Sequence, residues 1–345
     1  MREASIGRTV TDTESCAFFI DSPANEGTTA AMICIMKNTT CLQPEKIRAA
    51  IDAVFDPASH SIAEFLINGG SNNLPPATPT ATPPGISSYS LDWDIIRDMF
   101  DPKHYVKCEI NHTLVMQRLA LIDLFYSANL NRFTQLGIKQ LADVIITLST
   151  NSNGQAYDRI LATTAQQYVK NPIGHPLNNS LFNKGYGFPK THSVSIISKY
   201  LFFLLEAHGC PTGFPIYDSI VKKLLPRIAK KIGVTKTVNG TAINGKNLKV
   251  IDKFVDCINS VANTIGIQPQ KYNNVQLSQF AVLDYFLWRI GKVGALSFSL
   301  LLTEGELGNP AIQQALSNIK DKGAQHIVQL PYRFQLWWHI YHFIK

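Results

Sequence analysis

The amino-acid sequence predicts a mainly α fold with a small N-terminal α/β extension. Most of residues 89–345 carry apolar side chains at spacings of three and four, the pattern of a helix with a buried face. Clusters of Gly, Asn and Ser interrupt this pattern, as loops between helices do. Residues 69–88 are rich in Pro, Thr and Ala, cannot pack a core, and therefore mark a boundary inside the chain.

Three segments follow from this boundary. Residues 1–68 form the extension, residues 69–88 a linker or exposed loop, and residues 89–345 the helical domain. Within the extension, the apolar runs at 16–20 and 30–36 suit short strands, and residues 44–55 suit a helix that begins at Pro44. In the helical domain we expect helices over residues 91–100, 112–126, 136–148, 156–169, 194–205, 220–232, 250–265, 278–290 and 311–320.

Composition limits the class of protein. The net charge of +7 and pI of about 9.0 permit a polyanionic partner without requiring one. No apolar run approaches the roughly 18 residues of a membrane span, and residues 1–21 lack the pattern of a secretory signal, so we expect a cytoplasmic protein. The six cysteines form no C-x-x-C pair and suit reduced, packed thiols. We expect no metal site and no cofactor.

The region with the clearest chemistry is residues 193–230. Lys199 stands in the middle of the predicted helix 194–205, which is apolar on almost every face. Burial lowers the pKa of a lysine, and a neutral amine is a nucleophile. Asp218 stands where the next helix begins, a position that caps N–H groups and favours an ionised carboxylate. Taken alone, Lys199 would be interpreted as a lysine that snorkels to solvent, and Asp218 as a helix cap. Taken together, the two residues suggest a catalytic pair.

The pair also carries a family resemblance. The stretches S-K-Y-L-F-F-L-L and F-P-I-Y-D-S resemble the helix-hairpin-helix DNA glycosylases, most closely the bacterial 8-oxoguanine DNA glycosylase-like group. In that superfamily an aspartate follows a lysine by nineteen residues, as Asp218 follows Lys199. The similarity covers roughly residues 190–226, with a weaker similarity at 284–291 (DYFLWRIG). The resemblance implies a helix-hairpin-helix glycosylase-like fold in which Lys199 and Asp218 are catalytic.

The sequence departs from the superfamily at the hairpin that holds a DNA phosphate. A Leu-Pro-Gly-x-Gly turn usually precedes the lysine, whereas residues 192–198 here contain no glycine. We expect serine hydroxyls to substitute in part, namely those of Ser193, Ser195 and Ser198. Residues 219–251 contain no Asp or Glu, and this basic block is expected to bind the DNA backbone through Lys222, Lys223, Arg227 and Lys230. The candidate walls of a base pocket are Phe182, Tyr186, Phe188 and Trp288.

The resemblance implies base excision from double-stranded DNA, and we expect a monomer. The target base is extruded from the duplex, and Asp218 stabilises an oxocarbenium-like transition state at C1′. A neutral Lys199 would attack C1′ and leave a Schiff base that permits β-elimination; with a protonated Lys199, water would attack and only an abasic site would form. The implied substrates are damaged purines such as 8-oxoguanine, or glucosylated hydroxymethylcytosine in phage DNA for a member specialised in antiviral defence. The alternative from another class is a non-catalytic helical DNA-binding protein.

Overall fold

Helices form the framework of this protein, which confirms the mainly α prediction for the part of the chain that the structure describes. The structure is a computed structural model that describes residues 44–45, 47–48, 51, 96–101, 103, 109–126, 135–187, 190–272, 275–292 and 308–322. All of these residues belong to one unit, Thr40–Lys345. The predicted strands at 16–20 and 30–36, the linker at 69–88, most of the predicted helix at 44–55 and the first half of the predicted helix at 91–100 lie outside the described residues; residues 96–98 of the last are helical.

The helices fall where the apolar periodicity predicts them. They are α5 (His112–Tyr126), α6 (Gln135–Ser149), α7 (Asp158–Lys170), α8 (Lys190–Ala207), α9 (Ser219–Lys231), α10 (Ile251–Ile265), α11 (Gln279–Lys292) and α13 (Pro310–Lys322). The periodicity missed three short elements, because each is too short to show a period. These are the π-helix η5 (Asn178–Phe182), the 3₁₀-helix η6 (Asn247–Lys249) and a hairpin of β1 (Gln270–Tyr272) with β2 (Val275–Leu277).

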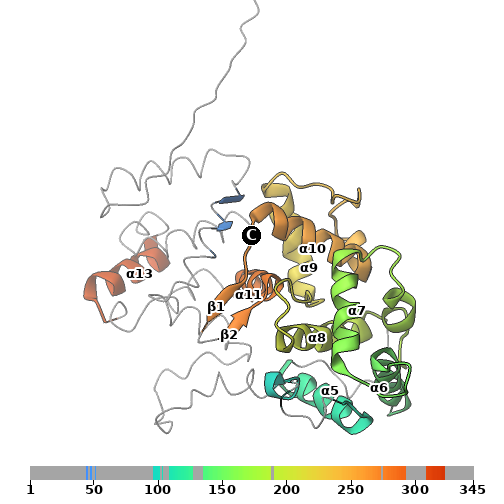
Figure 1. Cartoon of the computed structure of the whole chain (residues 1–345). Helices are drawn as coiled ribbons and strands as arrows, with labels where there is room; N and C mark the ends of the chain where they lie inside the picture. The colour runs from blue at the N-terminus through green and yellow to red at the C-terminus, as the bar shows by residue number, and fades with distance from the viewer. Residues whose placement is uncertain are drawn as a thin grey trace, which may run out of the picture. The chain divides into compact units, whose positions relative to one another are not determined.

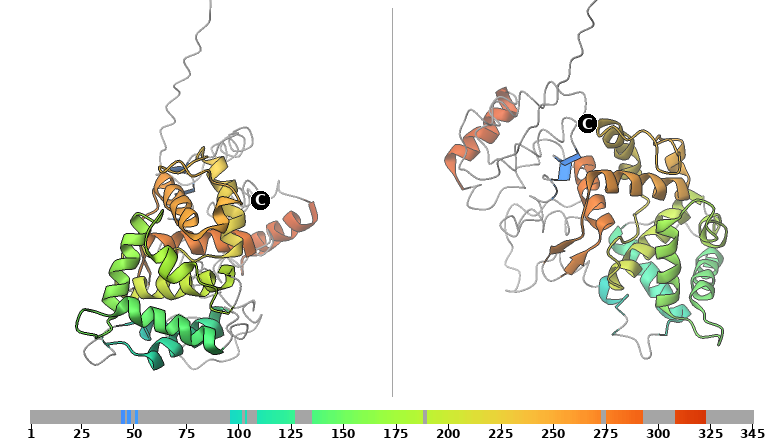
Figure 2. Two further views of the ribbon diagram at one scale, coloured as in Figure 1. Left: turned by 90° about the vertical axis from the view of Figure 1, so that its right-hand side faces the viewer. Right: turned by 45° about the horizontal axis from the view of Figure 1, so that its top comes forward.

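Helix α8 occupies the centre of the helical assembly. It packs against α5, α7 and η5, and Figures 1 and 2 show α5 and α6 on one side of it and α9 and α10 on the other. Helix α11 packs along α9 and also contacts α10. Every residue of α8 from Ile196 to Glu206 is buried, including Tyr200, Phe202 and Phe203. The all-round apolar sequence of this helix is therefore explained by burial on every side.

A buried ion pair fastens three of these helices together. Arg118 of α5 is fully buried and donates two hydrogen bonds to Asp158 of α7, at 2.8 and 2.6 Å. It also donates to the hydroxyl of Tyr200 on α8 at 3.1 Å and to the carbonyl of Met99 at 2.7 Å. Because its donors are shared among four acceptor atoms, the guanidinium sets how α5 and α7 sit against α8.

Two further sequence predictions concern cysteines and membranes. Cys210 and Cys257 are buried free thiols, as expected for thiols that pack as small hydrophobic groups. In the portion of the chain with described coordinates, no helix combines the length and the apolar character that crossing a bilayer demands.

Candidate functional site

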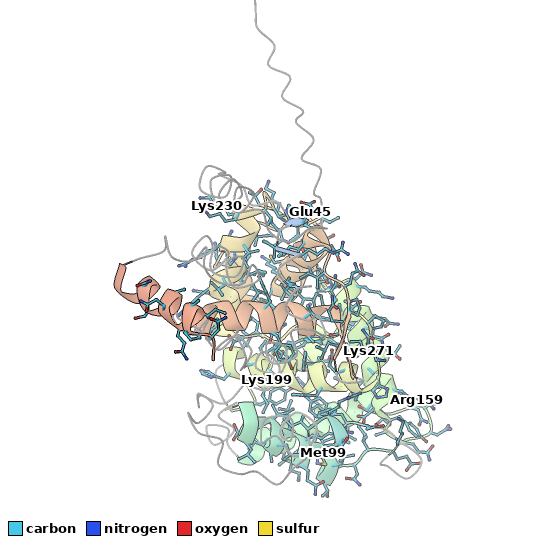
Figure 3. The ribbon with its side chains drawn as sticks, turned by 90° about the vertical axis from the view of Figure 1, so that its left-hand side faces the viewer. Glu45, Met99, Arg159, Lys199, Lys230 and Lys271 are labelled. Carbon is cyan, nitrogen blue, oxygen red and sulfur yellow. The ribbon has the colours of Figure 1, made fainter. Side chains whose placement is uncertain are left out.

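Lys199 lies in the middle of α8 with only 7% of its surface exposed. Burial lowers the pKa of its ammonium group, and the carboxylates of Asp218, Asp284 and Asp123 oppose that shift. The net direction is downward, so desolvation outweighs the three acidic neighbours. Figure 3 shows Lys199 on α8 within the helical assembly. A lysine in this setting gains the nucleophilic character of a neutral amine.

Asp218 is the N-cap of α9, as its position in the sequence predicts. Its backbone is extended, with φ −111° and ψ 148°, and its Oδ1 accepts hydrogen bonds from Ile220 N at 2.6 Å and from Val221 N at 3.4 Å. Lys222, one turn further along, places its ammonium 3.6 Å from the centre of the Tyr217 ring. Burial lowers the pKa of Lys222, and Asp218 opposes that shift. The cap holds one carboxylate oxygen of Asp218, and the charge of Asp218 acts on both lysines.

A hydrogen bond between their neighbours fixes the position of Asp218 relative to Lys199. The hydroxyl of Ser198 accepts the backbone N–H of Tyr217 at 2.9 Å and donates to the carbonyl of Ser195 at 2.9 Å. Ser198 and Tyr217 each immediately precede one member of the pair, so this bond joins the two neighbours directly. The nineteen-residue spacing in the sequence is thereby converted into proximity in space.

The turn after α8 brings the chain back toward Lys199. Gly209 has φ +64°, and the N–H groups of Gly209 and Cys210 donate to the carbonyls of Glu206 and Leu205, which forms a Schellman cap. The following loop is bound to the start of α11, because Gln279 N donates to Pro211 O at 2.8 Å and Phe280 N donates to Thr212 O at 3.1 Å. The loop that leads to Asp218 therefore also anchors α11.

Glu206 reinforces this junction from the end of α8. It is 5% exposed, and its Oε2 accepts the backbone N–H of Ser278 at 3.3 Å, next to the first residue of α11. Burial raises the pKa of Glu206 to about 7, against the opposing effects of hydrogen bonds from Ser278 and the charge of Arg97. Through the hydrogen bond from Ser278, Glu206 thus ties α8 to the helix that carries Asp284.

We expect Gly213→Ala to destabilise the fold by about 3 kcal/mol. Gly213 has φ +72°, and a Cβ at this position would overlap the side chain of Ser278 and touch Glu206 Oε1 at 3.0 Å. Strain and overlap therefore add together at the junction that positions Asp218. Chemical denaturation of both proteins measures the difference in free energy of unfolding.

Gly209→Ala is the matched control for this substitution. Gly209 also has a positive φ, +64°, but an added Cβ would meet nothing within 4 Å. It should cost only the backbone strain, about 1 kcal/mol. Equal losses in the two variants would contradict the close approach of Gly213 to Ser278.

Asp284 of α11 and Asp123 of α5 join the site in the structure, although sequence reasoning did not select them. Asp284 is 7% exposed, and its Oδ1 has no hydrogen-bond partner among the described residues. Burial raises the pKa of Asp284 well above its ordinary value, Asp218 adds to this effect, and Lys199 opposes it. The weaker sequence similarity at 284–291 was the available signal for Asp284. Asp123 is one acid in a largely apolar helix, and no sequence signal distinguished it.

Two of the serines expected to hold a phosphate are engaged inside the fold. Ser193 and Ser198 are both fully buried, and the hydroxyl of Ser193 donates to the carbonyl of Gly185 at 2.8 Å. Ser195 is half-buried. Because the hydroxyls of Ser193 and Ser198 already have backbone partners, they serve local structure, and we leave both out of the proposed DNA contacts.

The expected position of the hairpin is occupied by a helix. Residues 192–198 are all part of α8, which begins at Lys190 and continues through Lys199 without a turn. The positive-φ residues Tyr186 (φ 47°) and Gly187 (φ 74°) lie before the helix begins. A hairpin directly before Lys199 is therefore not present, because residues 192–198 lack the glycine that such a turn needs and their apolar side chains favour burial in α8.

The candidate base-pocket residues also have structural positions. Phe182 is 1% exposed and packs with the rings of Tyr168 and Phe214, at centroid distances of 5.3 and 6.1 Å. Tyr186 is 4% exposed, and its hydroxyl donates to Leu181 O at 3.2 Å. Both residues belong to the core. Phe188 and the side chain of Trp288 lie outside the described residues.

The predicted basic block follows α9 away from Asp218. Lys222 is half-buried beside the site, whereas Lys223, Arg227 and Lys230 are exposed. The 13 residues of α9 extend over about 20 Å, and Figure 3 shows Lys230 well removed from Lys199. From Lys222 to Lys230 the helix therefore presents cations over about 12 Å, the length of between three and four nucleotide steps of one DNA strand.

The site thus combines a buried amine, an N-cap carboxylate and a buried carboxyl group, supplied by α8, α9 and α11. This combination suits nucleophilic attack on an electrophilic carbon with stabilisation of a developing positive charge. The chain has no match among protein-family models, curated proteins or solved structures. The geometry and the chemistry of these residues therefore carry the functional argument.

Proposed function

We propose that this protein is a DNA N-glycosylase with a helix-hairpin-helix glycosylase-like helical fold that lacks the glycine hairpin. The observation that carries the proposal is the buried Lys199 beside the N-cap carboxylate of Asp218, linked through Ser198 and Tyr217. A snorkelling lysine would place its ammonium in water, whereas 7% exposure leaves this one largely desolvated. The desolvated amine and the capped carboxylate have different roles.

Lys199 is the proposed nucleophile. Its pKa is lowered by burial, so more of its amine is neutral and available at neutral pH than for a lysine in water. Attack of the amine on C1′ forms an N–C bond while the glycosidic bond breaks and its electron pair leaves with the base. Opening of the sugar ring then leaves a Schiff base, from which β-elimination nicks the strand.

Asp218 is the proposed electrostatic partner of the sugar. The transition state for glycosidic cleavage carries positive charge at C1′, and a fixed carboxylate stabilises it without reorganisation. Two backbone N–H groups of α9 hold the Asp218 carboxylate in place. Asp218 therefore contributes at the stage at which the charge develops.

We expect the exposed cations of α9 to bind DNA phosphates. Replacing Lys223, Arg227 and Lys230 together by Ala should lower the slope of log affinity against log salt by about 2.7, at about 0.9 for each lost phosphate contact. Fluorescence anisotropy with a duplex oligonucleotide at several salt concentrations measures this slope. The loss should be similar for different DNA sequences, because phosphate contacts carry no sequence information.

A charge-matched variant controls for the loss of three cations from the whole protein. Lys139, Lys170 and Lys271 are exposed on α6, α7 and β1, and their triple replacement by Ala removes the same net charge. This control should leave the salt slope nearly unchanged. Equal changes in the two triple variants would show that binding depends on overall charge and not on α9.

The substrate classes that suit the proposal are phage DNA with glucosylated hydroxymethylcytosine and DNA with 8-oxoguanine. The decisive experiment is mass spectrometry of the bases released from a panel of phage and genomic DNAs by the full chain. Release of a modified base supports the glycosylase. DNA binding without release from any DNA would identify a non-catalytic helical DNA-binding protein instead, and release of 8-oxoguanine alone would exclude the antiviral substrate.

A further inference from the structure

A second buried carboxyl group accompanies the proposed catalytic pair. Asp284 lies in the second turn of α11, and its Oδ1 atom has no hydrogen-bond partner among the described residues. Its electrostatic partners are Lys199 and Asp218. The junction described above fixes its position, since the first residues of α11 donate to the loop that leads to Asp218. A buried oxygen without a hydrogen-bond partner destabilises the fold, so its presence calls for an explanation such as a functional role.

The charges around Lys199 and Asp284 favour one location for a shared proton. An ammonium and a carboxylate buried together both lose hydration, whereas an amine and a carboxylic acid together carry no charge. Burial lowers the pKa of Lys199 and raises that of Asp284, so both shifts favour the neutral pair. The negative charge of Asp218 raises the pKa of both groups, and that of Asp123 raises the pKa of Lys199. The net shifts are nevertheless downward for Lys199 and upward for Asp284, which favours the proton on Asp284.

We propose that Asp284 is the proton acceptor that converts Lys199 from an ammonium into the nucleophilic amine. The N–H bond of Lys199 breaks and leaves its electron pair on nitrogen, while an O–H bond forms on the Asp284 carboxylate. The pair keeps its single proton and its net charge, so no other reactant is needed. This assignment rests on the proposed function, because it supplies the amine that attacks C1′.

The acceptor has a testable consequence for how the amount of reactive amine depends on pH. A lone buried lysine would lose its proton to solvent, and its reactive fraction would rise tenfold for each pH unit below its pKa. In a pair that shares one proton, the amine forms by internal transfer and its amount is nearly independent of pH between the two macroscopic ionisations. The shape of the pH profile therefore distinguishes a proton acceptor from a residue that only supports the fold.

The first test follows covalent trapping across pH. The full chain is mixed with a duplex oligonucleotide that contains one abasic site, in the presence of cyanoborohydride, and the rate of adduct formation is measured from about pH 6 to about pH 9. The rate of Asp284→Asn divided by the wild-type rate should rise about tenfold per pH unit until it levels off. The division removes the pH dependence of the reagent. A ratio that stays constant with pH would overturn the assignment.

Two variants sharpen this test. Asp284→Glu keeps a carboxyl group and should keep the wild-type shape of the profile. Glu206→Gln removes the other buried acid near the start of α11, which is not among the electrostatic partners of Lys199, and its ratio to wild type should not vary with pH. A pH-dependent ratio in Glu206→Gln equal to that in Asp284→Asn would also overturn the assignment.

The second test needs no DNA. Infrared spectra at neutral pH should contain carbonyl bands from buried protonated carboxyl groups. The band of Asp284 should disappear in Asp284→Asn and persist in Glu206→Gln, which removes only the contribution of Glu206. An unchanged spectrum in Asp284→Asn would overturn the assignment whether or not the protein cleaves DNA. Base release without any covalent adduct would support the proposed glycosylase activity but contradict the role of Asp284 as proton acceptor for Lys199. Absence of both base release and adduct would remove the glycosylase, and the assignment would fall with it.

Discussion

Asp218→Asn is expected to slow base release by about a thousandfold while leaving DNA binding intact. The substitution removes the negative charge that faces the developing cation at C1′. It keeps the cap of α9, because an Asn side-chain oxygen accepts the N–H groups of Ile220 and Val221 as well as Asp does. Single-turnover release of the base, measured beside anisotropy with the same DNA, separates chemistry from binding.

Two other substitutions at this position separate the cap from the charge. Asp218→Ser keeps a capping oxygen without a charge, and Asp218→Ala loses both, at a cost of about 1 kcal/mol in stability. Asn and Ser should therefore be equally inactive and nearly as stable as wild type. Base release by Asp218→Asn at the wild-type rate would leave Asp218 as a helix cap alone.

Lys199→Gln is expected to abolish the borohydride-trapped adduct with DNA that contains an abasic site. Glutamine is uncharged, reaches part of the way along the lysine side chain, and cannot form a Schiff base. The substitution also removes the cation whose charge opposes the raised pKa of Asp284, so the protonated form of that carboxyl group should be further favoured. Gel electrophoresis under denaturing conditions detects the adduct directly.

Lys222→Gln is the matched control for the nucleophile. Lys222 is the other lysine that interacts with Asp218, is half-buried, and also has a pKa lowered by burial. The Lys222→Gln variant should still form the adduct, because the ammonium of Lys222 lies over the Tyr217 ring and has no proposed covalent role. An adduct lost in Lys222→Gln and retained in Lys199→Gln would transfer the role of nucleophile to Lys222.

The same local structure accounts for both of these expected results. A Schellman cap ends α8, a short extended segment returns the chain, and Asp218 starts α9. The bond from Tyr217 to Ser198 then holds the segment against the middle of α8. The hydroxyl of Ser198 is buried in an apolar helix, where it bonds the backbone on either side of the candidate site. Ser198 is therefore better understood as a positioning residue than as a phosphate ligand.

Local patterns predicted the helices and the cap well. The spacing of apolar residues located α5 with the same bounds and the other main helices within a few residues. The position of Asp218 after Pro215-Ile216-Tyr217 predicted its capping role. The all-round apolar sequence of α8 predicted a buried helix, and the structure decided that Lys199 is buried within it and does not reach solvent. These properties depend on neighbours along the chain, so a single sequence contains the necessary information.

Contacts between distant segments decided the rest. Asp284 is 85 residues from Lys199 in the chain, and only the packing of α11 against α9 and the loop brings the two together. The burial of Ser193 and Phe182, and the helix in place of the hairpin, likewise depend on what covers them. The sequence by itself determined the helices, the place of Lys199 in the middle of a buried helix, and the capping aspartate. The tertiary structure alone decided which carboxyl groups surround that lysine, because desolvation and charge act through space and not along the chain.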